Sequence, residues 1–177
     1  PEVRAAQADL ARAHGIHGFC YHYYWFKGGK RLLDRPLNVV LSSGQPDFPF
    51  CLCWANENWT RRWDGQEQEI LMAQEHTPES DLAFLRDVLP IFKDPRYIRV
   101  HGRPLLVIYR ATLLPDMAAT VRRWHEEARR QGEMEPYLVA AESFDVSSAF
   151  AQAAGFDATC EFPPHGASAA MLANYGG

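Results

Sequence analysis

The sequence has 177 residues, of which 47% are hydrophobic and 23% are charged, and its formal net charge is −4. A chain of this length holds about one domain and buries an apolar core without disulfides or metals. The acidic balance argues against a nucleic-acid-binding protein, and no apolar run approaches the roughly 20 residues of a membrane-spanning helix.

Segments with helical and with strand character alternate along the whole chain. We expect helices over residues 3–13, 35–41, 78–92, 116–131 and 147–154. In the first of these, Val3, Ala6, Leu10 and Ala13 share one face. We expect strands over 16–24, 48–54, 104–109, 137–141 and 158–162, with a short hairpin leading into the third. Such alternation predicts a parallel sheet with crossover helices.

Two parallel architectures fit this order: an open doubly wound sheet and a (β/α) barrel. The open sheet predicts a glycine-rich phosphate turn, and neither G-x-G-x-x-G nor G-x-x-x-x-G-K-[ST] occurs. A complete barrel has eight strands over about 250 residues, more than this sequence provides. We therefore interpret residues 1–177 as one α/β domain, a partial (β/α)8 barrel of about five βα units from a longer protein.

Four cysteines, Cys20, Cys51, Cys53 and Cys160, lie in strand-like segments. The C-x-C pair has no second cysteine or histidine pair to complete a zinc pattern. We interpret the four as reduced core thiols, in keeping with a cytoplasmic protein. We expect no metal and no cofactor. Neither a phosphate loop nor an Asp-x-Asp metal site occurs.

Polar and aromatic residues gather after the C-terminal end of each predicted strand. The segments are 21–26, 54–65, 109–110, 142–145 and 161–166. Because ligands of parallel α/β folds bind at the C-terminal ends of the strands, these segments predict one binding rim.

The residue types in these segments are those that bind sugars. Aromatic rings give flat faces for sugar C–H groups, and amides, guanidinium groups and carboxylates bond the hydroxyls. Glycosidic chemistry needs two facing carboxylates, and Glu57, Glu142 and Glu161 are the candidates. The expected substrate-binding residues are Tyr23, Trp25, Asn56, Asn58, Trp59, Arg61, Arg62, Trp63, Asp64, Tyr109 and His165, with Tyr24 as a further aromatic platform. We expect Trp25, Glu57, Trp59 and His165 to meet in one cleft.

Each candidate also has a purely structural interpretation. Tyr23 is equally compatible with a buried strand face, and the spacing of Trp59 and Trp63 also fits a helical core stripe. The charged residues after Trp59 are compatible with a solvated ion-pair cluster. Glu57 has the alternative of capping a turn, and Glu142 and Glu161 that of pairing with arginines.

Several blocks resemble the WbsX-like family of glycosyltransferases. They are Gly18–Phe26, Pro46–Gly65 with its Trp-Ala-Asn-Glu-Asn-Trp-Thr-Arg-Arg-Trp-Asp-Gly run, Asp94–Tyr97, Gly102–Leu105, Gly155–Asp157 and Glu161–His165. The resemblance implies a role in lipopolysaccharide or O-antigen biosynthesis. It also implies kinship with glycoside hydrolase family 99, endo-α-mannosidases on a (β/α)8 barrel without a catalytic metal.

The family's Glu-Trp-x-Glu motif, which carries the catalytic carboxylates in the hydrolases, does not occur here, since no tryptophan follows a glutamate. The resemblance places that motif beyond Gly177, with Glu57 and Glu161 as substrate-binding or auxiliary acids. Transfer and hydrolysis both remain open. So do a noncatalytic glycan-binding module and an inactive barrel fragment. The expected partners are an oligosaccharide or polysaccharide and the remaining barrel segments of the parent chain.

Overall fold

The computed structural model describes residues 2–61, 66–143 and 146–162. Its helices are α1 (Glu2–Ala13), α2 (Arg35–Ser43), α3 (Pro78–Val88), α4 (Met117–Arg130) and α5 (Ser148–Ala154). Its strands are β1 (Phe19–Phe26), β2 (Lys30–Leu32), β3 (Phe50–Trp54), β4 (Trp59–Arg61), β5 (Gln66–Met72), β6 (Arg99–Val100), β7 (Arg103–Ile108), β8 (Tyr137–Glu142) and β9 (Ala158–Glu161). The predicted alternation and α/β class are confirmed, whereas the sequence did not indicate β2 or the hairpin of β4 and β5.

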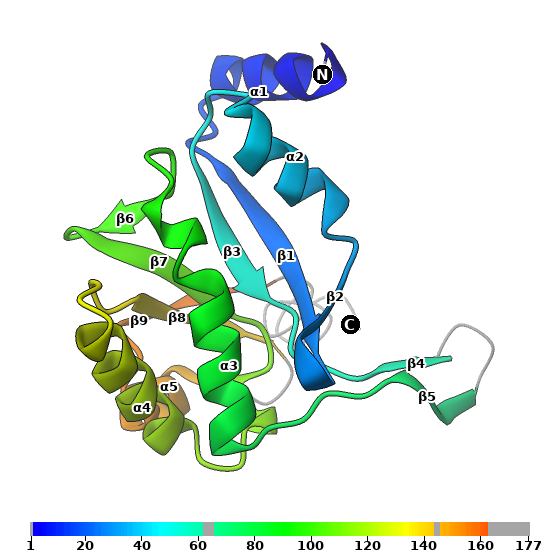
Figure 1. The fold of residues 1–177 in the computed structure, drawn as a ribbon, viewed down its shortest axis with the longest axis vertical. Coiled ribbons are helices and arrows are strands. Elements are labelled where there is room, and N and C mark those ends of the chain that lie inside the picture. The colour runs from blue at the N-terminus through cyan, green and yellow to red at the C-terminus, as the bar shows by residue number, and fades with distance from the viewer. Residues whose placement is uncertain (1, 62–65, 144–145, 163–177) are drawn as a thin grey trace, which may run out of the picture.

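The main sheet has the strand order β2-β1-β3-β7-β8-β9 (Figure 1). The pairs β1–β3, β3–β7, β7–β8 and β8–β9 are all parallel. The two short strands β2 and β6 run antiparallel to β1 and β7, and β6–β7 is the predicted hairpin. Consecutive parallel strands are therefore neighbours, which is the order of a barrel wall.

The sheet is strongly curved. In a flat sheet, β1 and β9 would lie about 19 Å apart, because four interstrand steps of about 4.8 Å separate them. Yet the rings of His22 in β1 and Phe162 directly after β9 have centroids 6.4 Å apart. The strands thus wrap around a concave face, as in a (β/α) barrel and unlike an open doubly wound sheet.

The convex face carries the main apolar core beneath α3 and α4. Phe84 of α3 stacks on Trp54 of β3 with ring centroids 3.9 Å apart, and Trp124 of α4 packs against both rings. All three side chains are fully buried. Three of the helices begin at a capping side chain: those of Thr77, Asp116 and Ser147 accept backbone hydrogen bonds. These caps fix where each helix starts to cover the sheet.

Helix α1 does not pack on the sheet with the apolar face that its sequence spacing predicts. Its buried residues are Ala8 and Ala11, which contact Phe48, while Val3 and Leu10 are 71% and 63% exposed. The face shared by Val3 and Leu10 is therefore turned to solvent. No helix in the described part of the chain is both long and apolar enough to cross a membrane.

Candidate functional site

The aromatic segment of β1 divides between the two faces of the sheet because successive strand residues point to opposite sides. Tyr23 and Trp25 face the helices and belong to the core cluster, packing on Phe84 of α3. His22 and Tyr24 point to the concave face, where their rings lie 6.0 Å apart. The concave face therefore holds the ligand-accessible aromatic residues of this strand.

The structure removes Tyr23 and Trp25 from the expected set of sugar platforms. Their exposed fractions are 3% and 2%. The Tyr23 hydroxyl donates a hydrogen bond to Asp87 of α3, and burial together with this bond raises the pKa of Tyr23. The expectation that Trp25 shares a cleft with Glu57 is wrong, because a ligand cannot reach a side chain enclosed by sheet and helix.

Glu57 lies three residues beyond the C-terminal end of β3 and forms an ion pair with Arg110, which lies two residues beyond β7. The Arg110 Nη1 and Glu57 Oε2 atoms are 3.4 Å apart. The side chains are 33% exposed for Glu57 and 15% for Arg110. A carboxylate accepts hydrogen bonds and a guanidinium donates them, so the pair offers both functions to sugar hydroxyl groups.

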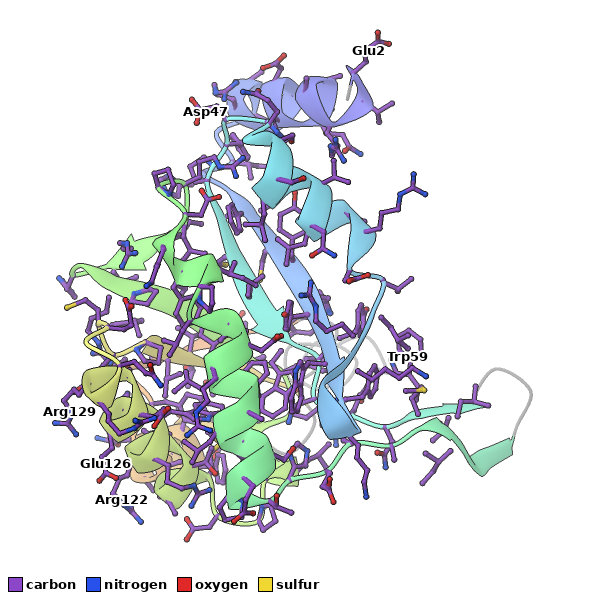
Figure 2. All side chains as sticks on the ribbon, viewed as in Figure 1. Glu2, Asp47, Trp59, Arg122, Glu126 and Arg129 are labelled. Atoms are coloured by element: carbon purple, nitrogen blue, oxygen red, sulfur yellow. The ribbon has the colours of Figure 1, made fainter. Side chains whose placement is uncertain are left out.

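Tyr24 and Trp59 form the aromatic wall beside this pair. Their ring centroids are 5.2 Å apart in an edge-to-face arrangement, and Trp59 also packs on Phe26 at 5.5 Å. The pKa of Tyr24 is raised, first by burial and then by the nearby Cys53 and Glu57. Trp59 lies at the base of the projecting β4–β5 hairpin, away from the helix layer (Figure 2).

His22, Tyr109 and Phe162 bring three strands together on the concave face. The Tyr109 ring lies 5.0 Å from that of Phe162 and 6.3 Å from that of His22. Ser143, beyond β8, donates a hydrogen bond to the Tyr109 carbonyl oxygen at 2.6 Å. The expected site residue Tyr109 is thus fixed within the curved face.

Asn56 and Asn58, expected as sugar ligands, contact the protein itself. Asn56 is fully buried, and its side-chain amide bonds both backbone groups of Arg110, each at 2.8 Å. The Asn58 Oδ1 atom accepts the Gln74 backbone N–H at 2.6 Å. In this structure Asn56 is inaccessible to a ligand, which corrects the expectation, and Asn58 braces the end of β5.

Glu142 and Glu161 lie in register on the adjacent strands β8 and β9. By strand alternation they share the side of Leu138 and Ala140, which belong to the helix-covered core. Glu142 is half-buried and Glu161 is exposed. Among the carboxylates expected to be catalytic, the structure brings Glu57, but neither of these two, next to the aromatic wall.

The remaining expected residues lie at the edge of, or outside, the residues that the structure describes. Arg61 is the last residue of β4. Arg62, Trp63, Asp64 and His165 lie outside the described residues, and so does the expected meeting of His165 with Glu57.

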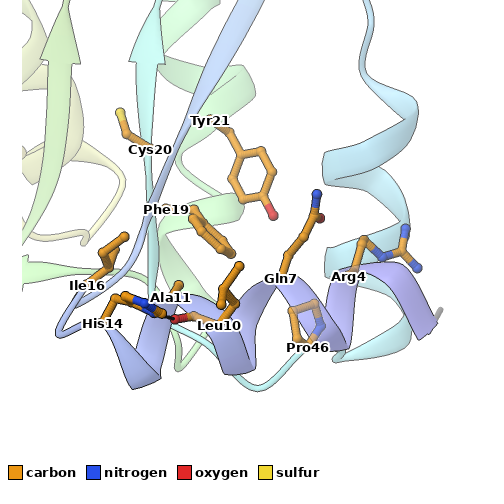
Figure 3. A pocket seen from close by; sticks show the side chains of 10 residues that line it. All are labelled: Arg4, Gln7, Leu10, Ala11, His14, Ile16, Phe19, Cys20, Tyr21 and Pro46. Atoms are coloured by element: carbon orange, nitrogen blue, oxygen red, sulfur yellow. Dashed lines mark hydrogen bonds between the residues drawn. The ribbon is translucent and has the colours of Figure 1, made fainter.

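An apolar groove of about 720 Å³ lies at the opposite end of β1, between this strand and α1. Leu10, Phe19 and Tyr21 line it together with Gln7 (Figure 3). It contains no expected site residue. The C-terminal rim, with its charged pair and aromatic wall, is therefore the better candidate site.

The four cysteines are unbridged. Cys20 and Cys51 lie in register on β1 and β3, and Cys51 and Cys53 are buried. Within the described ranges, no group of three or more His, Cys, Asp or Glu side chains is arranged to hold a metal ion.

Sequence reasoning placed His22, Arg110 and Phe162 within the predicted rim segments but did not name them as site residues. Strand alternation from Tyr24 would have placed His22 on the same face. Arg110 directly follows the predicted strand 104–109. The available signal was that the ends of neighbouring parallel strands meet at one edge of the sheet, which places Arg110 near Glu57. Phe162 lies in the predicted rim segment 161–166, but its contact with His22 depends on the curvature of the sheet.

Comparison with known proteins identifies relatives along the full chain. The profile of a family described as Glycosyltransferase WbsX matches residues 1–175. The protein WxcX of Xanthomonas campestris pv. campestris strain B100, described as uncharacterized, is 42% identical over 165 residues. That match covers 93% of this chain and 23% of the relative, so the chain spans about a quarter of the relative's length.

Solved structures share the fold at low identity. A glycoside hydrolase-like protein matches with a TM-score of 0.59 and 15% identity, covering 96% of this chain and 53% of its own. The GH99 endo-α-mannosidase from Bacteroides thetaiotaomicron matches with a TM-score of 0.56 and 14% identity, covering 90% and 42%. The described strands therefore have the arrangement of part of such a barrel.

Proposed function

The chain belongs to the WbsX glycosyltransferase family, and we propose that its curved sheet binds a glycan at the C-terminal rim. Family and fold together support a carbohydrate-active domain. The observation that carries the proposal is the Glu57–Arg110 pair beside the Tyr24–Trp59 wall. Sugars present hydroxyl groups at their edges and C–H groups on their faces, and this arrangement meets both.

The full-length protein, in this proposal, makes or cleaves a glycosidic bond of a bacterial surface polysaccharide such as an O-antigen. Glu57 contacts a sugar hydroxyl, and Trp59 and Tyr24 pack on sugar rings. Asn58 and Tyr109 are proposed as further glycan contacts, and the roles of Arg61, Arg62, Trp63, Asp64 and His165 as sugar ligands stay predictions. The unbridged thiols are in keeping with a reducing, cytoplasmic compartment.

Residues 1–177 form one partial barrel domain in this proposal, and further strands of the parent chain complete it. Residues 19–23 of β1 pair with β3 on one side, and their other edge has no strand partner among the described residues. β9 likewise pairs only with β8 in that part of the chain. Open parallel edges are sites where further strands add. The catalytic carboxylates then include residues outside this sequence, with Glu57 and Glu161 as substrate-binding or auxiliary acids.

The test is a panel of mannose-containing oligosaccharides and O-antigen repeats, offered to the full-length protein with products detected by mass. We expect Glu57→Gln to weaken glycan binding by about tenfold, since a hydrogen bond to a charged group is worth about 1.5–3 kcal/mol. Glu126→Gln is the matched control, because Glu126 is exposed on the outer face of α4 (Figure 2).

The possible results separate the remaining alternatives. Loss of turnover in Glu57→Gln together with weakened binding supports an enzyme that uses this rim. Unchanged binding in Glu57→Gln contradicts the assigned rim. Glycan binding by the wild type without any product supports the noncatalytic module instead.

A further inference from the structure

We propose that Asn56 is a positioning residue, whose buried amide holds Glu57 against Arg110 at the glycan rim. This inference rests on the proposed function, since it assigns Asn56 a role through Glu57. The residue was expected to bind sugar directly, and its complete burial excludes that role in this structure.

The contact is a two-way bond between a side chain and a backbone. The Asn56 Nδ2 group donates to the Arg110 carbonyl oxygen, and the Arg110 N–H donates to Asn56 Oδ1, both at 2.8 Å. The primary amide thus satisfies both backbone groups of one residue, as a neighbouring strand would. Losing the side chain leaves the Arg110 N–H without this partner, whereas the Arg110 carbonyl oxygen still accepts the Leu113 N–H at 3.1 Å.

The position of this contact explains what it holds. The paired residues of β3 and β7 end at Trp54 and Ile108, and a last backbone bond joins Tyr109 N–H to the Trp54 carbonyl oxygen at 3.1 Å. Beyond that point the segments that follow β3 and β7 leave the sheet. Asn56 joins these segments once more, because it directly precedes Glu57 in one and bonds Arg110 in the other.

The ion pair itself is a weak constraint. Glu57 is one-third exposed, and its oxygen lies 3.4 Å from the Arg110 nitrogen. Ion pairs of this kind contribute little by themselves, because water competes for both groups and two long side chains must be ordered. With both backbones fixed by Asn56, the two side chains are the only parts that still have to be ordered for the carboxylate and guanidinium to face one another.

A second amide supports the other side of the same turn. Asn58 accepts the Gln74 N–H at 2.6 Å, and the Gln74 side-chain amide donates to the Trp25 carbonyl oxygen at 2.7 Å. Glu57 therefore lies between two asparagines whose side chains are used by the protein. Among Asn56, Glu57 and Asn58, only Glu57 has a side chain that contacts a charged residue of the rim, Arg110.

The experiment compares Asn56→Ala and Asn56→Asp in the full-length protein. Asn56→Ala removes both bonds. Asn56→Asp keeps the acceptor of the Arg110 N–H but loses the donor to its carbonyl oxygen. Thr120→Val is the matched control, because Thr120 is also buried and also loses two hydrogen bonds, one donated to Asp81 and one accepted from Arg123, in the helix layer.

Hydrogen exchange and a crystal structure of the variants test positioning without any glycan. We expect faster exchange at the Arg110 amide in Asn56→Ala, retained protection in Asn56→Asp, and no local change in Thr120→Val. We expect the Glu57–Arg110 contact to be lost in the Asn56→Ala structure. An unchanged contact in that structure overturns the inference, even if the proposed glycan site is correct.

Glycan affinity gives the functional readout through a double-mutant cycle. We expect Glu57→Gln to weaken binding about tenfold in the wild type but less than about twofold in Asn56→Ala, because residues that act together are not additive. Equal tenfold losses on both backgrounds overturn the inference and leave Asn56 a fold-stabilising residue. If the wild type binds no glycan, the proposed function fails, while exchange and structure still decide the positioning role.

Discussion

The two faces of the curved sheet use neighbouring residues of the same strands for opposite purposes. The convex face buries Trp25 and Trp54 under α3 and α4, with exposed fractions of 2% and 0%. The concave face presents Tyr24, which is only half-buried, next to Trp59, and burial first, then the nearby Cys53 and Glu57, raise its pKa. One residue step along β1 therefore separates a core residue from a candidate ligand contact.

This comparison shows that aromatic composition alone does not identify a binding site. Both faces are rich in rings, and the difference lies in what covers them. On the convex face the rings are enclosed by helices, so their contribution is to stability. On the concave face they lie beside a charged pair, so their exposed surface is available to a ligand.

The largest effect should follow from opening the convex core. Phe84→Ala removes a fully buried ring that stacks on Trp54, and we expect a loss of about 3–5 kcal/mol in the free energy of unfolding. Urea unfolding followed by far-UV circular dichroism measures it. A loss under about 1 kcal/mol would mean that α3 does not hold the convex face, and the comparison would fail.

Tyr23 and Tyr24 give a sharper test, because they are adjacent and face opposite ways. Tyr23→Phe removes the hydroxyl that donates a hydrogen bond to Asp87. We expect the free energy of unfolding to fall by about 1–3 kcal/mol and the glycan affinity to stay unchanged. Tyr24→Ala removes the ring next to Trp59, and we expect glycan affinity to fall about tenfold.

Urea unfolding and glycan titration of both variants measure the two effects. The pattern contradicts the comparison if Tyr23→Phe weakens glycan binding as much as Tyr24→Ala does. Arg122→Ala is a suitable control for both, because this side chain is exposed on the outer face of α4 (Figure 2).

The sequence predicted the elements that depend on local signals. The helices expected over 78–92, 116–131 and 147–154 lie close to α3, α4 and α5, and the parallel strands follow from the helix–strand alternation. The faces of β1 had no such signal, because residues 19–26 are aromatic at almost every position and leave no period to read. Figure 1 shows the β4–β5 hairpin extending beyond the sheet. It makes few contacts with the core, so its sequence carries little of the apolar pattern by which a strand is predicted.

The candidate site was predicted only in part, for a related reason. Glu57 and Trp59 were found because they directly follow a predicted strand. The role of Asn56 was not, because it depends on Arg110, which is 54 residues away in the sequence. A buried amide and a ligand-binding amide are the same residue type at the same strand end, and only the tertiary contact separates them.

The smallest expected effect is a change in the alkaline titration of the tyrosines. Tyrosines on the two faces of the sheet should lose their protons in a different order as the pH rises. Burial raises the pKa of Tyr24, and it raises the pKa of Tyr97 well above the usual value. Tyr97 is fully enclosed, donating to the Leu105 carbonyl oxygen and accepting the Leu52 N–H. An unfolded tyrosine ionises near pH 10.

The sign of the pH effect follows from proton linkage. Between the unfolded and the folded pKa, the folded state keeps the phenol proton that the unfolded state has lost, so stability falls as the pH rises above about 10. We expect Tyr24 to ionise reversibly before unfolding, and Tyr23 and Tyr97 only with unfolding. In tyrosinate absorbance, Tyr24→Phe should then remove part of the reversible step and Tyr23→Phe none of it. A reversible step that Tyr23→Phe diminishes would show that α3 leaves Tyr23 open to solvent, and the two faces would no longer differ as the structure requires.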